Sequence, residues 1–360
     1  MAGDAKTVNT RELAALASGA KLSRRQLIGL AIVLVVAIAL PWFVTNYRTF
    51  QLTLAIIYAI AVLGLNILTG YNGQFSLGHG AFYAIGAYTA AIMMEQGGMA
   101  YYWTIPAAGV ACLAAGFLFG LPALRLEGLY LALATFALSV ATPQLLKYNA
   151  IAPWTGGVQG VTIIKPDPPF GLPISQDRWL YYFSLVVMLV MFVCAWNLLR
   201  GRTGRALKAI RDNPIAASAM GVNTALYKSL TFGVSALYTG VAGALGAIAI
   251  QFVAPDSFNF FLSVTFLVGV VIGGLASIPG AIFGGVVIVF IPNFAEQVSK
   301  AAPWAIYGMF LILFMYFMPT GIWGFIRLLY AKFTRGRRAA SGPRASPTAT
   351  AATIEKRRSA

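Results

Sequence analysis

The chain has 360 residues, of which 59% are hydrophobic and only 10% charged, and its mean hydropathy is +0.76. This apolar fraction exceeds the roughly 45–50% of soluble globular domains, so the composition excludes a soluble globular protein. The net charge of +16 would fit nucleic-acid binding, but the basic residues follow a membrane topology, and no nucleic-acid partner is expected. One histidine and two cysteines in apolar runs, Cys112 and Cys194, predict neither a metal site nor a disulfide.

Apolar segments recur along the chain, and each is close to the about 20 residues that a helix needs to cross a bilayer. Because lipid offers the backbone no hydrogen-bond partners, the sequence predicts helices and an all-α polytopic membrane protein. Two short, Gly-rich segments, 76–94 and 280–297, are candidates for re-entrant or broken helices, which leaves eight to ten crossings. The predicted spans are 26–44, 50–69, 76–94, 103–121, 128–146, 180–199, 228–250, 260–278, 280–297 and 303–326.

The positions of Lys and Arg predict the orientation of these spans. With about ten crossings, both termini are cytoplasmic and most of the 26 basic residues fall on that side, as the positive-inside rule requires. The transmembrane domain then covers residues 26–330, between disordered cytoplasmic tails at 1–25 and 331–360. The longest exterior loop is 147–179, whose Pro and Gly content predicts a turn-rich structure. The basic residues left outside are Arg48, Lys147, Lys165, Arg178 and Lys300.

Catalytic patterns are missing from the sequence. It contains no carboxylate pair, no Ser/His/Asp set and no cluster of metal ligands, so we do not expect an enzyme. No Asp, Glu, Lys or Arg lies at the centre of a predicted span, where ion-driven carriers place ionisable groups. Energy for uphill transport would therefore have to come from another subunit.

Glycines and polar side chains interrupt the apolar pattern between residues 65 and 88. Such groups persist at membrane depth where they face a cavity or a partner helix, so the stretch is either a broken helix lining a substrate path or a tight helix crossing. For His79 alone, packing or capping is favoured over ligand contact. A G-x-x-S pattern at 73–76 recurs at 274–277; it fits inverted or duplicated halves, although chance also explains so short a match. The candidate path residues are Asn66, Tyr71, Gln74, Ser76, His79 and Ser277.

A polar, basic insert occupies residues 200–227 between two long apolar segments. Pro214 suits the first turn of a helix, with Asp212 or Asn213 as its N-cap, and Gly221 suits the position after its C-terminus. The insert therefore predicts a short helix whose small side chains permit docking into a groove on another protein. The alternative is an ordinary interfacial loop that carries positive-inside charge.

Several motifs resemble the LivM-type permeases of branched-chain amino-acid ABC importers, in the same order and over about residues 25–330. The resemblance implies that the insert is a coupling loop for cytoplasmic ATPase subunits. Relatives often carry Glu where this chain has Pro214 and Ser218, so Asp212 is the only acidic candidate in the insert for contacting an ATPase. The motifs are LNILTGYNGQFSLGHGAFYAIGAYTAA, LRLEGLYLALATFAL, TGGVQG, GRALKAIRDNPIAASAMG and GGLASIPGAIFGG. The implied coupling residues are Arg211, Asp212, Pro214, Ala216, Ala217 and Gly221.

The resemblance also implies the partners and the cargo. A LivH-type sibling permease, two cytoplasmic ABC ATPase subunits and a periplasmic solute-binding protein would join this chain at the lipid bilayer of the bacterial inner membrane. The path would carry Leu, Ile and Val. No cofactor is expected in this chain, since it lacks a phosphate-binding G-x-x-x-x-G-K-[ST] motif and ATP would sit on the partners. The alternatives are the same importer type carrying urea, amides or other amino acids, an ATPase-independent channel or facilitator, or a membrane scaffold.

Overall fold

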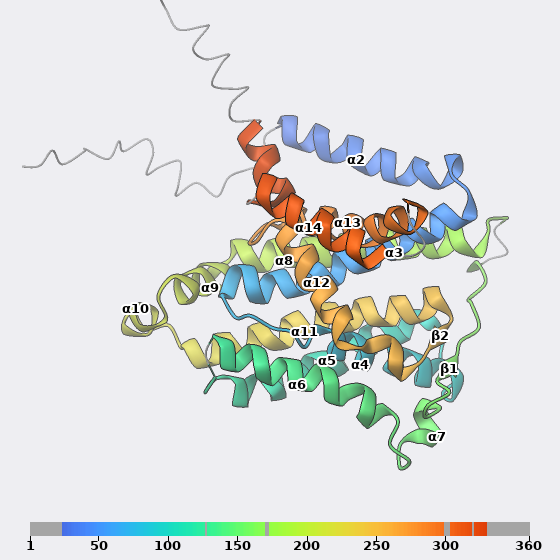
Figure 1. Ribbon diagram of the computed structural model, residues 1–360, viewed down its shortest axis with the longest axis horizontal. Helices are drawn as coiled ribbons and strands as arrows, with labels where there is room; N and C mark the ends of the chain where they lie inside the picture. Colours follow the sequence, from blue (N-terminus) through green and yellow to red (C-terminus); the bar gives the residue numbers. More distant parts are fainter. Residues whose placement is uncertain (1–23, 127, 170–172, 299–302, 319, 330–360) are drawn as a thin grey trace, which may run out of the picture.

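The computed structural model describes residues 24–126, 128–169, 173–298, 303–318 and 320–329. The two predicted tails lie almost wholly outside these residues. The described chain is a bundle of helices, most of which run along a common direction (Figure 1). A last helix over residues 321–329 follows α14. In chain order the elements are α2 (Arg24–Phe43), α3 (Asn46–Asn66), η1 (Ile67–Tyr71), α4 (His79–Glu95), α5 (Tyr101–Ala123), α6 (Leu129–Leu146), α7 (Ala152–Thr155), β1 (Val161–Thr162), α8 (Gln176–Arg200), α9 (Arg202–Asp212), α10 (Pro214–Ala219), α11 (Thr224–Ile250), β2 (Phe252–Val253), η3 (Pro255–Phe258), α12 (Phe260–Gly273), α13 (Ile278–Val298) and α14 (Pro303–Phe317).

Six helices of the described chain are long and apolar enough to cross a membrane, namely α3 continued by η1, α5, α6, α8, α11 and α13. The helical multi-span architecture is therefore confirmed. Every predicted span overlaps a helix. However, α4, α12 and α14 are shorter than this length, and α2 qualifies only as a shorter apolar helix, Val33–Phe43, so ten complete crossings are not established. The side of the membrane on which the termini lie stays a prediction.

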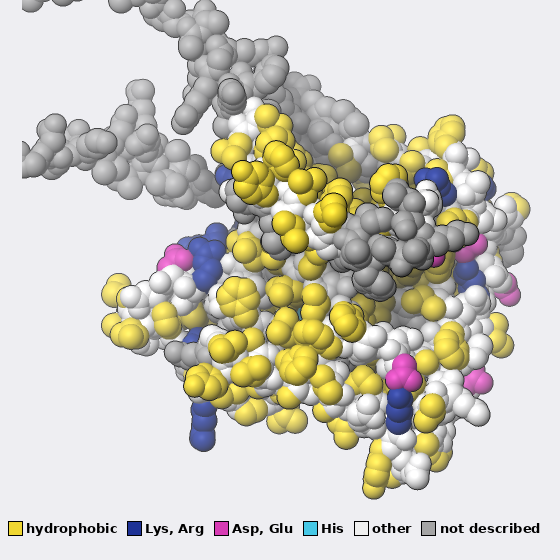
Figure 2. Space-filling view, in the orientation of Figure 1, with side chains coloured by type: hydrophobic (Ala, Val, Ile, Leu, Met, Phe, Trp, Pro, Cys, Tyr) yellow, Lys and Arg dark blue, Asp and Glu magenta, His cyan; other side chains and the backbone are white. Residues whose placement is uncertain are grey.

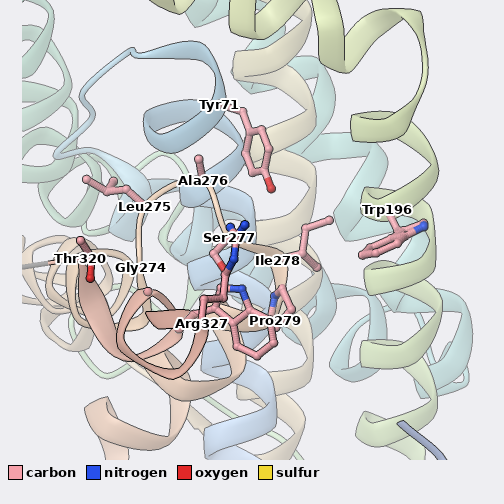
Figure 3. A pocket seen from close by; sticks show the side chains of 12 residues that line it. Tyr71, Trp196, Gly274, Leu275, Ala276, Ser277, Ile278, Pro279, Thr320 and Arg327 are labelled. Atoms are coloured by element: carbon pink, nitrogen blue, oxygen red, sulfur yellow. The ribbon is translucent and has the colours of Figure 1, made fainter. Parts of the chain in front are cut away.

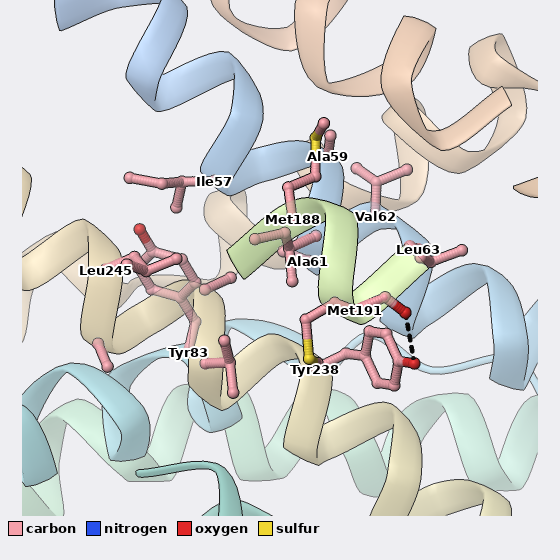
Figure 4. Packing of buried hydrophobic residues seen from close by; sticks show 14 of the residues in the cluster. Ile57, Ala59, Ala61, Val62, Leu63, Tyr83, Met188, Met191, Tyr238 and Leu245 are labelled. Carbon is pink, nitrogen blue, oxygen red and sulfur yellow. Dashed lines mark hydrogen bonds between the residues drawn. The ribbon is translucent and has the colours of Figure 1, made fainter. Parts of the chain in front are cut away.

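Helices α3 and α11 form the centre of the bundle, where about four fifths of each span is buried. Helix α11 packs against α5, α4 and α3, and α3 packs against α13 and α8. Figure 4 shows the apolar side chains of α3, α8 and α11 meeting here, with the Tyr238 hydroxyl donating to the carbonyl of Met191 at 2.9 Å. The backbones of α4 and α11 approach closely at Gly86 of α4, where an added methyl group would collide with the carbonyl oxygen of Gly240 on α11. Such small residues allow the close approach that stabilises helix pairs in lipid.

Two helix breaks face each other inside the bundle. Helix α3 ends in the wide turn η1, and an irregular segment, residues 72–78, precedes α4. Helix α12 ends at Gly273, and residues 274–277 precede α13. Both copies of the G-x-x-S pattern lie in these breaks, and their glycines have positive φ, 75° at Gly73 and 116° at Gly274.

The structure corrects three details of the predicted spans. The span 260–278 is wrong beyond Gly273, because the backbone of Gly274 leaves the helical region. The span 280–297, a candidate broken helix, is continuous as α13, and the break precedes it. The span 303–326 is interrupted, since α14 ends at Phe317 and the next helix begins at residue 321.

Opposite ends of the bundle carry the insert and the predicted exterior loop (Figure 1). At one end α8 leads into α9 and α10. At the other, β1 pairs antiparallel with β2, so that the 147–179 loop is tied to the segment after α11. The ion pair between Lys147 and Asp256, 2.5 Å apart, adds a second tie. Figure 2 shows hydrophobic side chains covering the flank between these ends, which suits a surface that faces lipid.

Replacing Gly86 with Ala should destabilise the protein by about 1–3 kcal/mol, because the methyl group has to displace the backbone of α11. The matched control is Gly308→Ala on α14, where an added methyl group meets no atom within 4 Å. Thermal unfolding of both variants in detergent measures the difference. Equal unfolding temperatures would contradict the close α4–α11 crossing.

Candidate functional site

Asn66, at the end of α3, binds the break between α12 and α13. Its Nδ2 donates to the carbonyl of Ser277 at 2.8 Å and to that of Gly274 at 3.4 Å. Its Oδ1 accepts the backbone N–H of Ala276 at 2.9 Å. Ala276 has a φ of 55°, in the left-handed region that costs a residue other than glycine roughly 1–2 kcal/mol. The amide of Asn66, which is 1% exposed, therefore holds a strained turn more than 200 positions away.

Gly70 connects the turn at residues 274–277 to the insert, because it packs against Ala276 and binds Arg211. A methyl group on Gly70 would collide with Oδ1 of Asn66 and with the backbone of Ala276, so only glycine fits between them. The carbonyl of Gly70 accepts a hydrogen bond from Nη1 of Arg211, the penultimate residue of α9, at 3.1 Å. Arg211 is oriented by Asp212, whose Oδ1 accepts from Nε at 3.0 Å and from Nη2 at 2.9 Å. We call Asn66, Gly70, Arg211 and Ala276 the junction.

His79, at the start of α4, lies in a buried chain of hydrogen bonds. The Ser235 hydroxyl donates to the carbonyl of Gly64 at 2.6 Å, which uses its single proton. The Nε2 of His79, 2.6 Å from the Ser235 oxygen, must therefore donate, and Nδ1 accepts from the Ser76 hydroxyl at 2.9 Å. Ser76 in turn accepts the N–H of Gly78. A neutral imidazole satisfies every group in this chain, which joins α4 to α11 and α3.

The predicted path residues do not all line one cavity. Four of them, Asn66, Gln74, Ser76 and His79, are buried and hydrogen-bonded within the chain. Tyr71 and Ser277 instead share a pocket of about 260 Å³ beside the junction (Figure 3). The structure therefore brings the six residues to one region but separates buried packing groups from two pocket-lining ones.

The short helix predicted within the insert is observed as α10. Asn213 is its N-cap and accepts the N–H of Ala216 at 3.0 Å, and Gly221 follows with a φ of 83°. Ala217 is buried, whereas Pro214, Ala216 and Gly221 are exposed. Arg211 and Asp212 lie one turn earlier, on α9.

Two exposed apolar residues of this region were not singled out from the sequence. Ile215 is 80% exposed and Met220 is 85% exposed. Both lie at α10, which projects from one end of the bundle (Figure 1). A groove of about 280 Å³ adjoins α10 and includes Ile215 and Lys228 among its lining residues. The sequence signal that could have identified them is the presence of large apolar side chains in an otherwise polar insert, because exposed apolar groups often mark an interaction site.

Comparison with known proteins identifies the family. A family model described as "Branched-chain amino acid transport system / permease component" matches residues 47–319. The chain belongs to this permease family. The permease is 33% identical over 321 residues to the high-affinity branched-chain amino acid transport system permease protein LivM of Salmonella typhimurium strain LT2, which covers 83% of this chain and 75% of LivM. LivM of Escherichia coli K12 matches equally, and LivH of that strain is 27% identical over 300 residues, 76% of this chain and 92% of LivH. No solved structure matches the permease.

Replacing Asn66 with Leu should destabilise the permease by about 1–3 kcal/mol, because Ala276 N–H and the Ser277 carbonyl lose their partner. Asn46→Leu, at the exposed start of the same helix, should change stability by no more than about 0.5 kcal/mol. Thermal unfolding in detergent compares the two. A wild-type unfolding temperature for Asn66→Leu would show that the amide does not hold the turn.

Proposed function

We propose that this permease forms, with a LivH-type sibling, the path for branched-chain amino acids in a bacterial ABC importer of the inner membrane. The names of the relatives support the substrate class, since LivM and LivH are both described as high-affinity branched-chain amino acid permeases. The match covers five sixths of this chain, so the likeness extends over the whole bundle rather than one motif. Leu, Ile and Val are the expected cargo.

The remaining partners are two cytoplasmic ATPase subunits and a periplasmic solute-binding protein. Helix α10 supplies a surface for an ATPase, because Ile215 on the helix and Met220 directly after it are exposed next to small side chains. Docking would bury these apolar side chains, and each buried methylene contributes about 0.8 kcal/mol. In this proposal the ATPases bind and hydrolyse ATP, and the permease itself carries no cofactor.

The hydrogen bond between Arg211 and Gly70 carries the mechanism. When ATP binding draws the ATPases together, α10 and α9 move with them. Because Arg211 is held on one side by Asp212 and on the other by Gly70, that motion reaches η1. Gly70 packs directly on Asn66 and Ala276, so both helix breaks shift together and the path changes the side to which it opens. Hydrolysis of ATP returns the assembly to its starting state.

The substrate is tested by uptake in a strain that lacks the gene. Complementation with the wild-type gene should restore uptake of labelled Leu, Ile and Val, and ATP depletion should abolish it. Urea, short amides and aromatic amino acids complete the panel. Uptake of one of these in place of Leu, Ile and Val would overturn the substrate, and uptake that survives ATP depletion would indicate a facilitator.

The mechanism is tested with Arg211→Gln in vesicles that contain the assembled importer. Loss of a charged hydrogen bond costs about 1.5–3 kcal/mol, so the amount of substrate taken up per ATP should fall about tenfold or more. ATP hydrolysis should continue, because α10 is unchanged. Arg205→Gln, on the exposed side of α9, should keep the wild-type ratio. An unchanged ratio for Arg211→Gln would exclude the junction as the coupling route.

A further inference from the structure

The pocket beside the junction lies between five parts of the fold. Tyr71 of η1 and Trp196 of α8 form one side, and the break at residues 274–277 forms another. The start of α13 and the last helix, 321–329, complete the lining. Figure 3 shows Arg327 beside Ser277, with Trp196 across the pocket. An occupant would therefore touch the last helix and the strained turn at the same time.

The charge around this pocket is positive. Arg327 lines it, and among its described lining residues there is no acidic side chain. Lys208 Nζ lies 5.8 Å from the centre of the Tyr71 ring, and Arg200 Cζ lies 4.9 Å from that of Trp196. The first residues of α13 add the positive end of a helix dipole. The pocket is therefore suited to an anion and would leave the ammonium group of a free amino acid unpaired.

The surroundings of the pocket indicate the source of that anion. Trp196 and Trp323 both line it, and tryptophan is enriched where a membrane protein meets the lipid headgroups. Leu275, also in the lining, is 52% exposed, as an apolar side chain at a lipid boundary would be. Basic pockets between transmembrane helices are suited to anionic headgroups.

We propose that this pocket binds the phosphate of an anionic phospholipid headgroup through Arg327. The bound phosphate holds the last helix against residues 274–277, the turn that Asn66 also holds. Lipid binding thus stabilises the junction and adjusts how firmly the two helix breaks move together. This site is distinct from the α10 groove, which is lined by other residues.

The test uses the assembled importer, stripped of lipid in neutral detergent and titrated with phosphatidylglycerol or phosphatidylcholine. Native mass spectrometry counts the bound lipids without any transported substrate, so its outcome is independent of the assigned cargo. Wild-type protein should prefer phosphatidylglycerol. Arg327→Gln should weaken its binding about fivefold, the expected loss for one cation at an anionic surface, whereas Arg327→Lys should keep most of it.

Two controls decide whether the site and its ligand are correctly assigned. Arg48→Gln removes an exposed arginine next to the start of α3, at the other end of that helix from η1, and should bind phosphatidylglycerol as the wild type does. Inorganic phosphate at the same concentration should leave the lipid bound. Equal binding by Arg327→Gln and the wild type would overturn the site, and displacement by phosphate would overturn the lipid as its ligand.

Discussion

A backbone that leaves helical geometry inside a membrane protein has to find its hydrogen-bond partners within the protein, because lipid offers none. The two helix breaks of this permease obey that constraint through polar side chains brought from other helices. Asn66 serves the turn at 274–277, and Thr135 accepts the N–H of Leu77 at 2.9 Å. The polar residues around the breaks thus have a structural role, because they satisfy the backbone groups that a broken helix leaves unpaired. Any role in transport is additional to this one.

The same constraint explains how an insert outside the bundle can act on its interior. Gly70 packs so closely that no free space separates η1 from the 274–277 turn. A displacement of η1 should therefore move the turn, because closely packed interiors are hard to compress. A long arginine side chain is needed only because α9 lies beyond the end of α3. In the proposed mechanism, motion therefore passes through the hydrogen bond from Arg211 to Gly70 and then through the close contact of Gly70 with Ala276. The strained backbone of Ala276 favours relaxation of the turn when that contact moves.

The sequence predicted the positions of helices, which depend on local composition. It failed to predict backbone turns and side-chain directions that are determined by residues distant in the chain. Hydropathy located each long apolar helix, and the Asn-Pro pair and Gly221 gave the limits of α10 within one residue. The end of α12 was missed because Gly274 adopts its φ of 116° in a turn held by Asn66, 208 positions earlier. Arg211 is one of the predicted coupling residues, and the structure adds that its Nη1 points inward to Gly70. Nothing local to Arg211 encodes that direction.

Polar residues at membrane depth favour either a path or a packing role, and the hydrogen-bond chain at His79 shows how geometry distinguishes them. Every proton in that chain has one donor and one acceptor, so a substrate could bind His79 only by breaking a buried bond. An unpaired group there would cost about 1–3 kcal/mol, which makes such binding unfavourable. Tyr71 and Ser277 line the pocket beside the junction instead. In the proposed cycle, motion of the junction should therefore reach that pocket, while the His79 chain holds α4 against α11.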